Sequence, residues 1–180
     1  SVLAKQWQKH LPDTIFYCPN APEICSLNPS GFEWFDLSSE KQNIIIEKSL
    51  IAEEKLNLFI DHVLSTNNLA DNQISLVGFS QGSMIAIQTA LKRKNKINHV
   101  VGFSGKIIDC DHLKVHIKSK PKILLIHGDK DNVVPVSFHF ESLNFFDLLN
   151  YKINSKIIKD CDHRIDLEGS TLGLEFLKKT

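Results

Sequence analysis

Apolar residues in this chain occur in two patterns, short mostly apolar runs and longer stretches with helical spacing. A short apolar run bounded by turn residues is typical of a buried strand, whereas apolar positions three or four residues apart predict an amphipathic helix. The runs predict strands over residues 14–18, 74–77, 99–103, 123–126 and 155–159. The helical spacing predicts helices over residues 2–11, 40–66, 83–93, 137–149 and 167–178.

Predicted strands and helices alternate along most of the chain, which indicates an α/β fold with a doubly wound, mostly parallel sheet. The length of 180 residues fits one domain with a substantial core, so residues 1–180 are interpreted as a single domain. In sheets of this kind, functional sites form in the loops at the carboxyl ends of the strands. Residues just after the predicted strands are therefore the first candidates for chemistry.

The composition is that of an ordinary globular protein, with 42% hydrophobic and 23% charged residues and a net charge of zero. This balance gives no indication of a nucleic-acid partner or an anionic membrane. No apolar run approaches the roughly 18 residues that an integral membrane segment needs. The 4 cysteines are not needed to staple a chain of this size, so we expect free thiols and a cytoplasmic location.

The sequence Gly78-Phe79-Ser80-Gln81-Gly82 lies between a predicted strand and a predicted helix. A Gly-x-Ser-x-Gly in this context is the nucleophile elbow pattern, in which a strained turn presents the serine hydroxyl above the sheet. The two glycines allow strand and helix to pass closely. Such a pattern also arises by chance, but the flanking strand and helix favour Ser80 as a nucleophile.

Asp131 and His163 each follow a later predicted strand, so the chain order Ser, Asp, His matches that of an α/β-hydrolase triad. A serine needs a base to remove its proton, and a carboxylate must fix the imidazole tautomer. His127 is the alternative base and Asp129 the alternative acid.

A zinc site is a weaker alternative. Asp160 and Asp162 flank His163, and the motif Cys-Asp-His occurs at both 110–112 and 161–163. Two cysteines and two histidines could bind zinc. Their spacing differs from that of common zinc modules, so we expect neither a metal nor another cofactor.

The predicted loop over residues 19–38 is rich in apolar side chains, including Phe32, Trp34 and Phe35. A long ordered loop directly after a strand is a candidate pocket wall. Equally, these aromatic residues could simply cover the core.

Taken together, the motifs resemble the phospholipase/carboxylesterase family of small α/β-hydrolases, the group that includes acyl-protein thioesterases. The resemblance rests on Pro19-Asn20-Ala21-Pro22, Gly31-Phe32-Glu33-Trp34-Phe35, the elbow, Phe103-Ser104-Gly105, His127-Gly128-Asp129-Lys130-Asp131, Val133-Val134-Pro135 and His163. It implies that Asp131 is the acid and His163 the base, and that the backbone N–H of Gln81 is one oxyanion donor. It also implies a substrate site near Trp34, to which we add Phe32, and hydrolysis without metal.

Two departures from the family pattern stand out. Ser83 occupies a position where many family members have a second glycine after the elbow. The family's first strand and its His-Gly-x-Gly loop, which supplies the other oxyanion donor, have no counterpart, because Gly31 is the only glycine before Gly78. We expect the sequence to start after that loop, which would leave the strand over 14–18 with an unpaired edge.

The sequence therefore predicts a serine hydrolase that cleaves carboxylic esters or acyl thioesters through an acyl-enzyme on Ser80. Its partners would be a small ester, a lysophospholipid or an acylated protein, and the chain would be a monomer or a homodimer. The alternative is a catalytically weak or inactive hydrolase-fold binding protein, because half of the oxyanion hole is missing.

Overall fold

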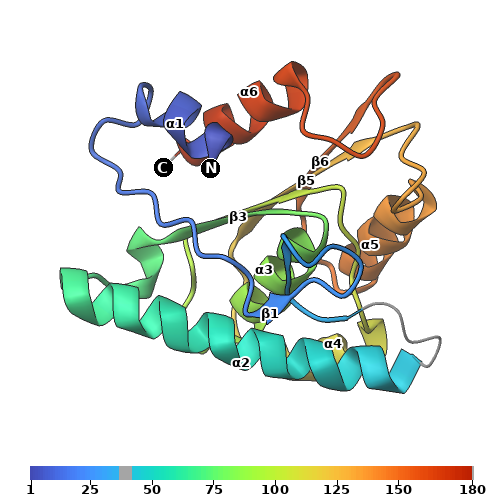
Figure 1. The fold of residues 1–180 in the computed structure, drawn as a ribbon, viewed down its shortest axis with the longest axis horizontal. Coiled ribbons are helices and arrows are strands. Elements are labelled where there is room, and N and C mark those ends of the chain that lie inside the picture. The colour runs from blue at the N-terminus through green and yellow to red at the C-terminus, as the bar shows by residue number, and fades with distance from the viewer. Residues whose placement is uncertain (37–41, 180) are drawn as a thin grey trace.

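A four-stranded parallel sheet forms the centre of the computed structural model, which describes residues 1–36 and 42–179 (Figure 1). Its strands are β3 (Ser75–Phe79), β4 (His99–Phe103), β5 (Lys122–Gly128) and β6 (Asn154–Ile158), in that spatial order. The register pairs Gly78 with Gly102 and Phe103 with Ile126. All four strands therefore end at the same edge, where the predicted site residues follow them.

Helices cover both faces of this sheet (Figure 1). The helices are α1 (Val2–Gln8), α2 (Gln42–Asn67), α3 (Gln81–Lys92), α4 (Cys110–His116), α5 (Ser137–Leu148) and α6 (Leu167–Leu177), with a 3-10 turn over Asp71–Gln73. Helices α1 and α6 lie on one face, and α2 to α5 lie on the other. The predicted fold class, an α/β-hydrolase with a doubly wound parallel sheet, is confirmed.

Two hydrophobic cores result from the alternation of side chains along the strands. In β4, Val100 packs into the core under α2 to α5, whereas Val101 packs into the core under α1 and α6. In β5, Leu125 and Ile126 divide in the same way. Strands buried on both faces read as continuous apolar runs, which explains why the sequence revealed them.

Helix α3 is buried over every residue from Ser83 to Leu91, because it is packed between the sheet and α2. This burial fixes the start of α3 against the end of β3. The turn between them is the predicted nucleophile elbow.

The predicted strand over residues 14–18 is wrong. Within residues 1–36 and 42–179 the segment pairs with no strand. Of its apolar residues, Ile15 and Tyr17 are exposed, whereas Phe16 packs against the α1–α6 core. Residues with high β-propensity form a strand only where a neighbour accepts their ladder hydrogen bonds.

Two further differences concern the loops. Within the predicted loop lies a short hairpin of β1 (Glu23–Ile24) and β2 (Phe32–Glu33), and α4 was not predicted. The predicted start of the long helix at residues 40 and 41 and the loop end at 37–38 lie outside the described residues. In the two described stretches, no helix is both long enough and apolar enough to cross a membrane.

Candidate active site

The turn between β3 and α3 has the geometry of a nucleophile elbow. Ser80 has φ of 53° and ψ of −121°, a conformation that non-glycine residues rarely adopt. A Cβ added to Gly78 would lie 2.3 Å from the backbone carbon and oxygen of Gly82. Only glycine at position 78 therefore lets the strand pass the helix this closely.

Hydrogen bonds on both sides hold the strained residue in place. The Ser80 N–H donates to the Phe103 carbonyl at 2.9 Å, and the Ser80 carbonyl accepts from the N–H groups of Ser83 and Met84. These two are the first bonds of α3, so the N–H groups of Gln81 and Gly82 precede the helical ladder. They lie at the positive end of the helix dipole, which favours a developing negative charge.

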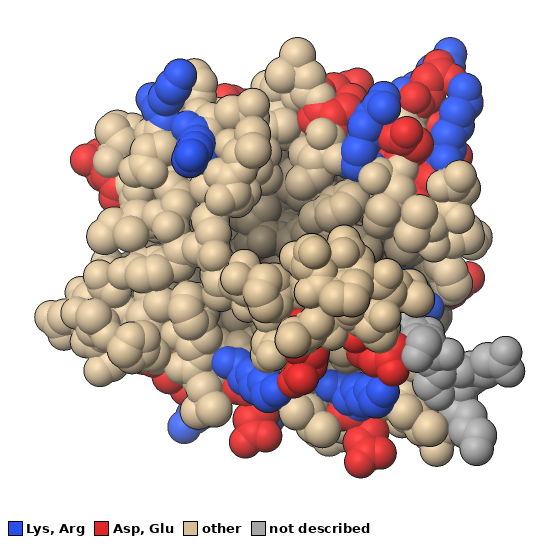
Figure 2. All heavy atoms as spheres, viewed as in Figure 1, with Lys and Arg blue, Asp and Glu red and all other residues tan. Residues whose placement is uncertain are grey.

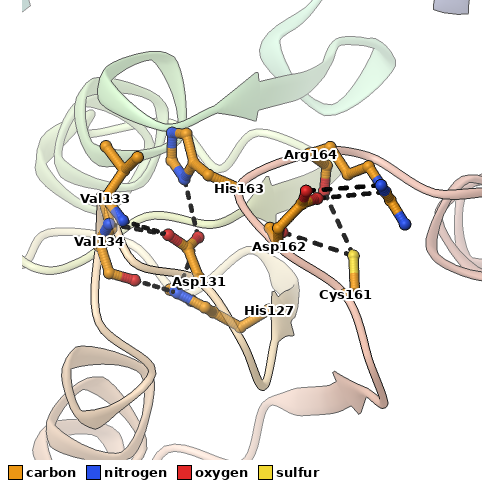
Figure 3. A network of polar contacts seen from close by, with 8 residues as sticks. All are labelled: His127, Asp131, Val133, Val134, Cys161, Asp162, His163 and Arg164. Atoms are coloured by element: carbon orange, nitrogen blue, oxygen red, sulfur yellow. Dashed lines mark hydrogen bonds and ion pairs between the residues drawn. The ribbon is translucent and has the colours of Figure 1, made fainter.

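The predicted acid, Asp131, lies in a loop after β5 and is 6% exposed. Its Oδ1 accepts the N–H groups of Val133 at 3.0 Å and Val134 at 2.8 Å, and its Oδ2 accepts Nδ1–H of His163 at 2.7 Å (Figure 3). Burial alone would raise the pKa of this carboxyl. The hydrogen bonds from His163, Val134 and Val133 more than offset it and hold the pKa below its ordinary value.

The predicted base, His163, follows β6, and the structure brings it into direct contact with Asp131. Its ring packs against that of Phe79, with centroids 4.7 Å apart, so the base lies beside the residue that precedes Ser80. Nδ1 is engaged by Asp131, and the second ring nitrogen points away from that carboxylate (Figure 3).

The alternative base, His127, already has a structural partner. Its ring is 1% exposed, Nε2 donates to the Val134 carbonyl at 2.8 Å, and the same nitrogen lies 3.4 Å from Asp131 Oδ2 (Figure 3). The alternative acid, Asp129, accepts the N–H of Cys161 at 3.3 Å. The His127 contact is made with the loop after β5, and the Asp129 contact connects that loop to the loop after β6.

The carboxylates next to the base face solvent. Asp160 pairs with Lys130, and Asp162 pairs with Arg164, with all four side chains more than half exposed. Exposed pairs of this kind contribute little to stability. Neither carboxylate is placed to orient the His163 ring as Asp131 does.

The loop that carries Trp34 is attached to the elbow by the side chain of Gln81. Its Oε1 accepts the Trp34 N–H at 3.0 Å, and its Nε2 donates to the Phe35 carbonyl at 2.9 Å. The Trp34 indole nitrogen would lie 3.6 Å from a Cβ on Gly82, so the half-buried ring lies at the helix start. Phe35 is buried in the core, whereas Phe32 in β2 is 53% exposed. Phe35 therefore covers the core, as one interpretation of the loop expected, whereas the pocket wall expected from Phe32 and Trp34 stays a prediction.

The face that carries the hairpin is hollowed at its centre, between α1 and α6 on one side and the hairpin on the other (Figures 1 and 2). The atoms around this hollow belong mostly to uncharged residues (Figure 2). Few charged side chains are therefore placed around this hollow to pair with an ionised ligand.

The two Cys-Asp-His stretches do not form a metal site. Cys110 is exposed at the start of α4, whereas Cys161 is buried after β6. Among the described residues, no group of three or more His, Cys, Asp and Glu side chains could hold a metal ion.

The sequence model of the phospholipase/carboxylesterase family matches residues 2–180. The chain belongs to this family. Acyl-protein thioesterase 1 of Saccharomyces cerevisiae is 31% identical over 184 residues, an alignment that covers 93% of this chain and 78% of the yeast protein. Acyl-protein thioesterase 1 homolog 1 of Dictyostelium discoideum is 27% identical over 175 residues, covering 92% of this chain and 76% of that protein.

Solved structures show the same relationship. The crystal structure of esterase PE8 has a TM-score of 0.93 and 34% identity, and the match covers 99% of this chain and 84% of that one. Arabidopsis thaliana SOBER1, at 18% identity and a TM-score of 0.84, supports the fold. The predicted resemblance to the phospholipase/carboxylesterase family is confirmed.

Sequence reasoning missed three contributions to the site of this family member. It assigned Gln81 a role through its backbone alone, although the side chain holds the Trp34 loop. It gave no role to Val133 and Val134, whose N–H groups donate hydrogen bonds to Oδ1 of Asp131. All three residues belong to motifs that carry the resemblance, but a motif gives residue types and not the contacts that those residues make.

Proposed function

We propose that this protein is a serine hydrolase that cleaves carboxylic esters or acyl thioesters through an acyl-enzyme on Ser80. The observation that carries the proposal is the 2.7 Å hydrogen bond between Asp131 and His163, beside a serine held in a strained turn. Membership of the phospholipase/carboxylesterase family supports the same class of reaction.

In the first half of the reaction, His163 takes the proton of the Ser80 hydroxyl as its oxygen attacks the substrate carbonyl. The Asp131 carboxylate stabilises the resulting imidazolium and keeps the ring in the correct orientation. The Gln81 N–H donates to the oxyanion that forms. His163 then gives its proton to the departing alcohol or thiol, which leaves the acyl group on Ser80.

In the second half, a water molecule attacks the acyl-enzyme while His163 takes one of its protons. The tetrahedral intermediate collapses, the Ser80 oxygen recovers a proton from His163, and the carboxylic acid is released. Asp131 stays ionised throughout, consistent with its lowered pKa.

The substrate class is inferred from the surroundings of the elbow. The hairpin next to Trp34 exposes Ile24 by 69%, Leu27 by 88% and Phe32 by 53%. Apolar surface of this kind favours an acyl chain over a charged acid. Relatives are named acyl-protein thioesterases and esterases, so small esters, lysophospholipids and acylated proteins are the candidates.

Hydrolysis of p-nitrophenyl esters and of an acyl thioester by the purified protein tests this proposal. The Ser80→Ala substitution should lower kcat by at least about 10³-fold, because the nucleophile is lost. Ser155→Ala, at an exposed serine of β6 outside the hairpin, is the matched control and should leave kcat unchanged. An equal loss in both variants, or none in either, would contradict a nucleophilic role for Ser80.

Acyl chain length tests the position of the substrate. Each buried methylene contributes up to about 0.8 kcal/mol, so kcat/KM should rise by up to about fourfold per carbon over the first few carbons. Trp34→Ala should flatten this rise. An unchanged profile in that variant would remove the Trp34 loop from the pocket.

The second hypothesis, a non-catalytic binding protein, predicts ligand binding without turnover in the unmodified protein. Neither the thioesterases nor the esterase named above give it support. The cytoplasmic location, the single domain and the oligomeric state expected from the sequence stay predictions.

A further inference from the structure

A cavity of about 10 Å³ lies among residues of α3, β4, β5 and α5. Its lining includes Ser83 of α3, His127 of β5, and His139 and Ser142 of α5. This volume is about the size that holds one water molecule. Phosphate or any organic ligand is too large to fit.

Two of the polar atoms in its lining have no partner. Ser83 Oγ and His139 Nε2 belong to residues that are 1% and 2% exposed, and in the described part of the chain neither atom forms a hydrogen bond. Buried polar groups in folded proteins are almost always hydrogen-bonded, and cavities that stay dry are lined by apolar groups. The two unpartnered atoms therefore indicate that a small polar ligand occupies the cavity.

Two glycines make room for the Ser83 hydroxyl. A Cβ on Gly102 would lie 2.4 Å from Ser83 Oγ, and one on Gly105 would lie 2.5 Å from it. Ser142, by contrast, is already satisfied, because it donates to the Phe138 carbonyl at 2.8 Å and accepts from Ile107 N–H at 3.4 Å. The hydroxyl of Ser83 is thus seated in a space that the backbone of β4 and its following loop leave open.

We infer that this cavity binds one water molecule, which bridges Ser83 Oγ and His139 Nε2. A water molecule donates and accepts hydrogen bonds, so it matches a hydroxyl and either tautomer of a neutral imidazole. It also meets the minimum of two polar partners that buried waters have.

The position of this bridge connects it to catalysis, a step that rests on the proposed function. Ser83 lies one helical turn after Ser80, on the helix that the elbow starts. The His139 ring packs edge to face on His127, with centroids 5.6 Å apart, and His127 in turn holds the Val134 carbonyl beside Asp131. The water therefore links the nucleophile's helix to the acid's loop, and Ser83 and His139 are positioning residues.

A high-resolution crystal structure of the protein tests the water directly. The expected result is an ordered solvent peak at about 2.6–3.2 Å from both Ser83 Oγ and His139 Nε2. Direct hydrogen bonds from these atoms to protein groups, with no ordered solvent between them, would overturn the inference.

A double-mutant cycle tests the bridge in solution without relying on activity. Ser83→Ala and His139→Phe should each lower the equilibrium constant for folding, and the double variant should lose little more than the worse single variant. Thr89→Val is the matched control. Thr89 Oγ1 on α3 is also buried and has no hydrogen-bond partner among the described residues, but Thr89 does not line the cavity. Its effect should add to that of His139→Phe. Additive effects of Ser83→Ala and His139→Phe would overturn the bridge.

Kinetics test the positioning role. Ser83→Ala should lower kcat for a p-nitrophenyl ester by about two- to tenfold, the equivalent of one hydrogen bond, at unchanged KM. His139→Gln, which keeps a polar group near Nε2, should retain more kcat than His139→Phe. A change in KM alone would contradict positioning. Failure of the unmodified protein to hydrolyse any ester would instead contradict the proposed function. The double-mutant cycle on folding does not depend on activity, so it would still test the water bridge.

Discussion

Replacing Asp131 by asparagine separates the role of the acid from its role in the fold. Oδ1 accepts two N–H groups, from Val133 and Val134, so the asparagine carbonyl oxygen must take that place. Its NH₂ group then faces Nδ1 of His163, at the position where Oδ2 of Asp131 accepts a hydrogen bond from Nδ1–H at 2.7 Å. Two donors cannot face each other, so Nδ1 must lose its hydrogen and the other ring nitrogen must carry it.

A histidine with its proton on the nitrogen that faces the serine cannot accept the serine proton. The expected loss in kcat for Asp131→Asn is about 10⁴-fold, or about 5 kcal/mol of transition-state stabilisation. Because the number of hydrogen bonds is preserved, the free energy of unfolding should change little. Asp131→Ala, in contrast, leaves two N–H groups and His163 unpartnered, so it should lower both kcat and stability.

The assay is p-nitrophenyl ester hydrolysis together with urea unfolding, and the His163 tautomer is read from its ring nitrogen resonances by NMR. Asp129→Asn is the matched control and should keep most of kcat, since the Asp129 carboxylate accepts the backbone N–H of Cys161, which the asparagine carbonyl oxygen can also accept. If Asp131→Asn keeps a tenth or more of kcat while Asp129→Asn loses it, Asp129 is the acid and the account of the site is wrong.

Three further predictions concern the surroundings of the site. Gln81→Leu removes two hydrogen bonds to the Trp34 loop, at about 0.5–1.5 kcal/mol each, and should raise KM for long acyl esters. An unchanged KM would contradict a role for the Gln81 side chain in holding this loop at the substrate site. Gly128→Ala places a Cβ 2.2 Å from the Cys161 carbonyl oxygen and should lower the free energy of unfolding by about 1–3 kcal/mol or more. Gly31→Ala is the control and should be tolerated, because the nearest atom to its Cβ lies at 3.5 Å. Equal stabilities of the two variants would refute the close approach at Gly128. Burial, assisted by His127, lowers the pKa of His139 to about 4 from an ordinary value of 6.5, so between these values the unfolded chain binds a proton that the folded chain excludes. Stability should therefore fall by up to about 3 kcal/mol as pH drops from about 6.5 to about 4, and urea midpoints should show this fall flattened in His139→Phe.

The parts of the fold that the sequence predicted are those buried on both sides. Strands β4 and β5 read as apolar runs because helices cover both of their faces. Gly78 marked the elbow because only glycine permits the close approach of strand and helix there. The segment over residues 14–18 was predicted wrongly for the opposite reason. Its β-branched and aromatic residues carry the local signal of a strand, but strand formation depends on a hydrogen-bonded neighbour that local sequence does not specify.

The candidate site was predictable where residues follow strands in a fixed order. Residue order alone left His127 and His163 as rival bases, and the family resemblance favoured His163. In the structure their ring nitrogens have different partners, since His127 Nε2 donates to the Val134 carbonyl whereas His163 Nδ1 donates to Asp131. The Gln81 side chain forms hydrogen bonds with Trp34 and Phe35, which lie 47 and 46 positions before it, so no local sequence pattern could reveal these contacts. The same holds for the meeting of Ser83 and His139 at one cavity.

The assignment of Ser80 as the nucleophile is tested most directly by covalent labelling. The purified protein is treated with a fluorophosphonate, and the adduct is located by mass spectrometry of its peptides. The account predicts one adduct, on Ser80, with labelling abolished in Ser80→Ala and strongly slowed in His163→Ala. An adduct on another residue, or labelling that persists in Ser80→Ala, would contradict it.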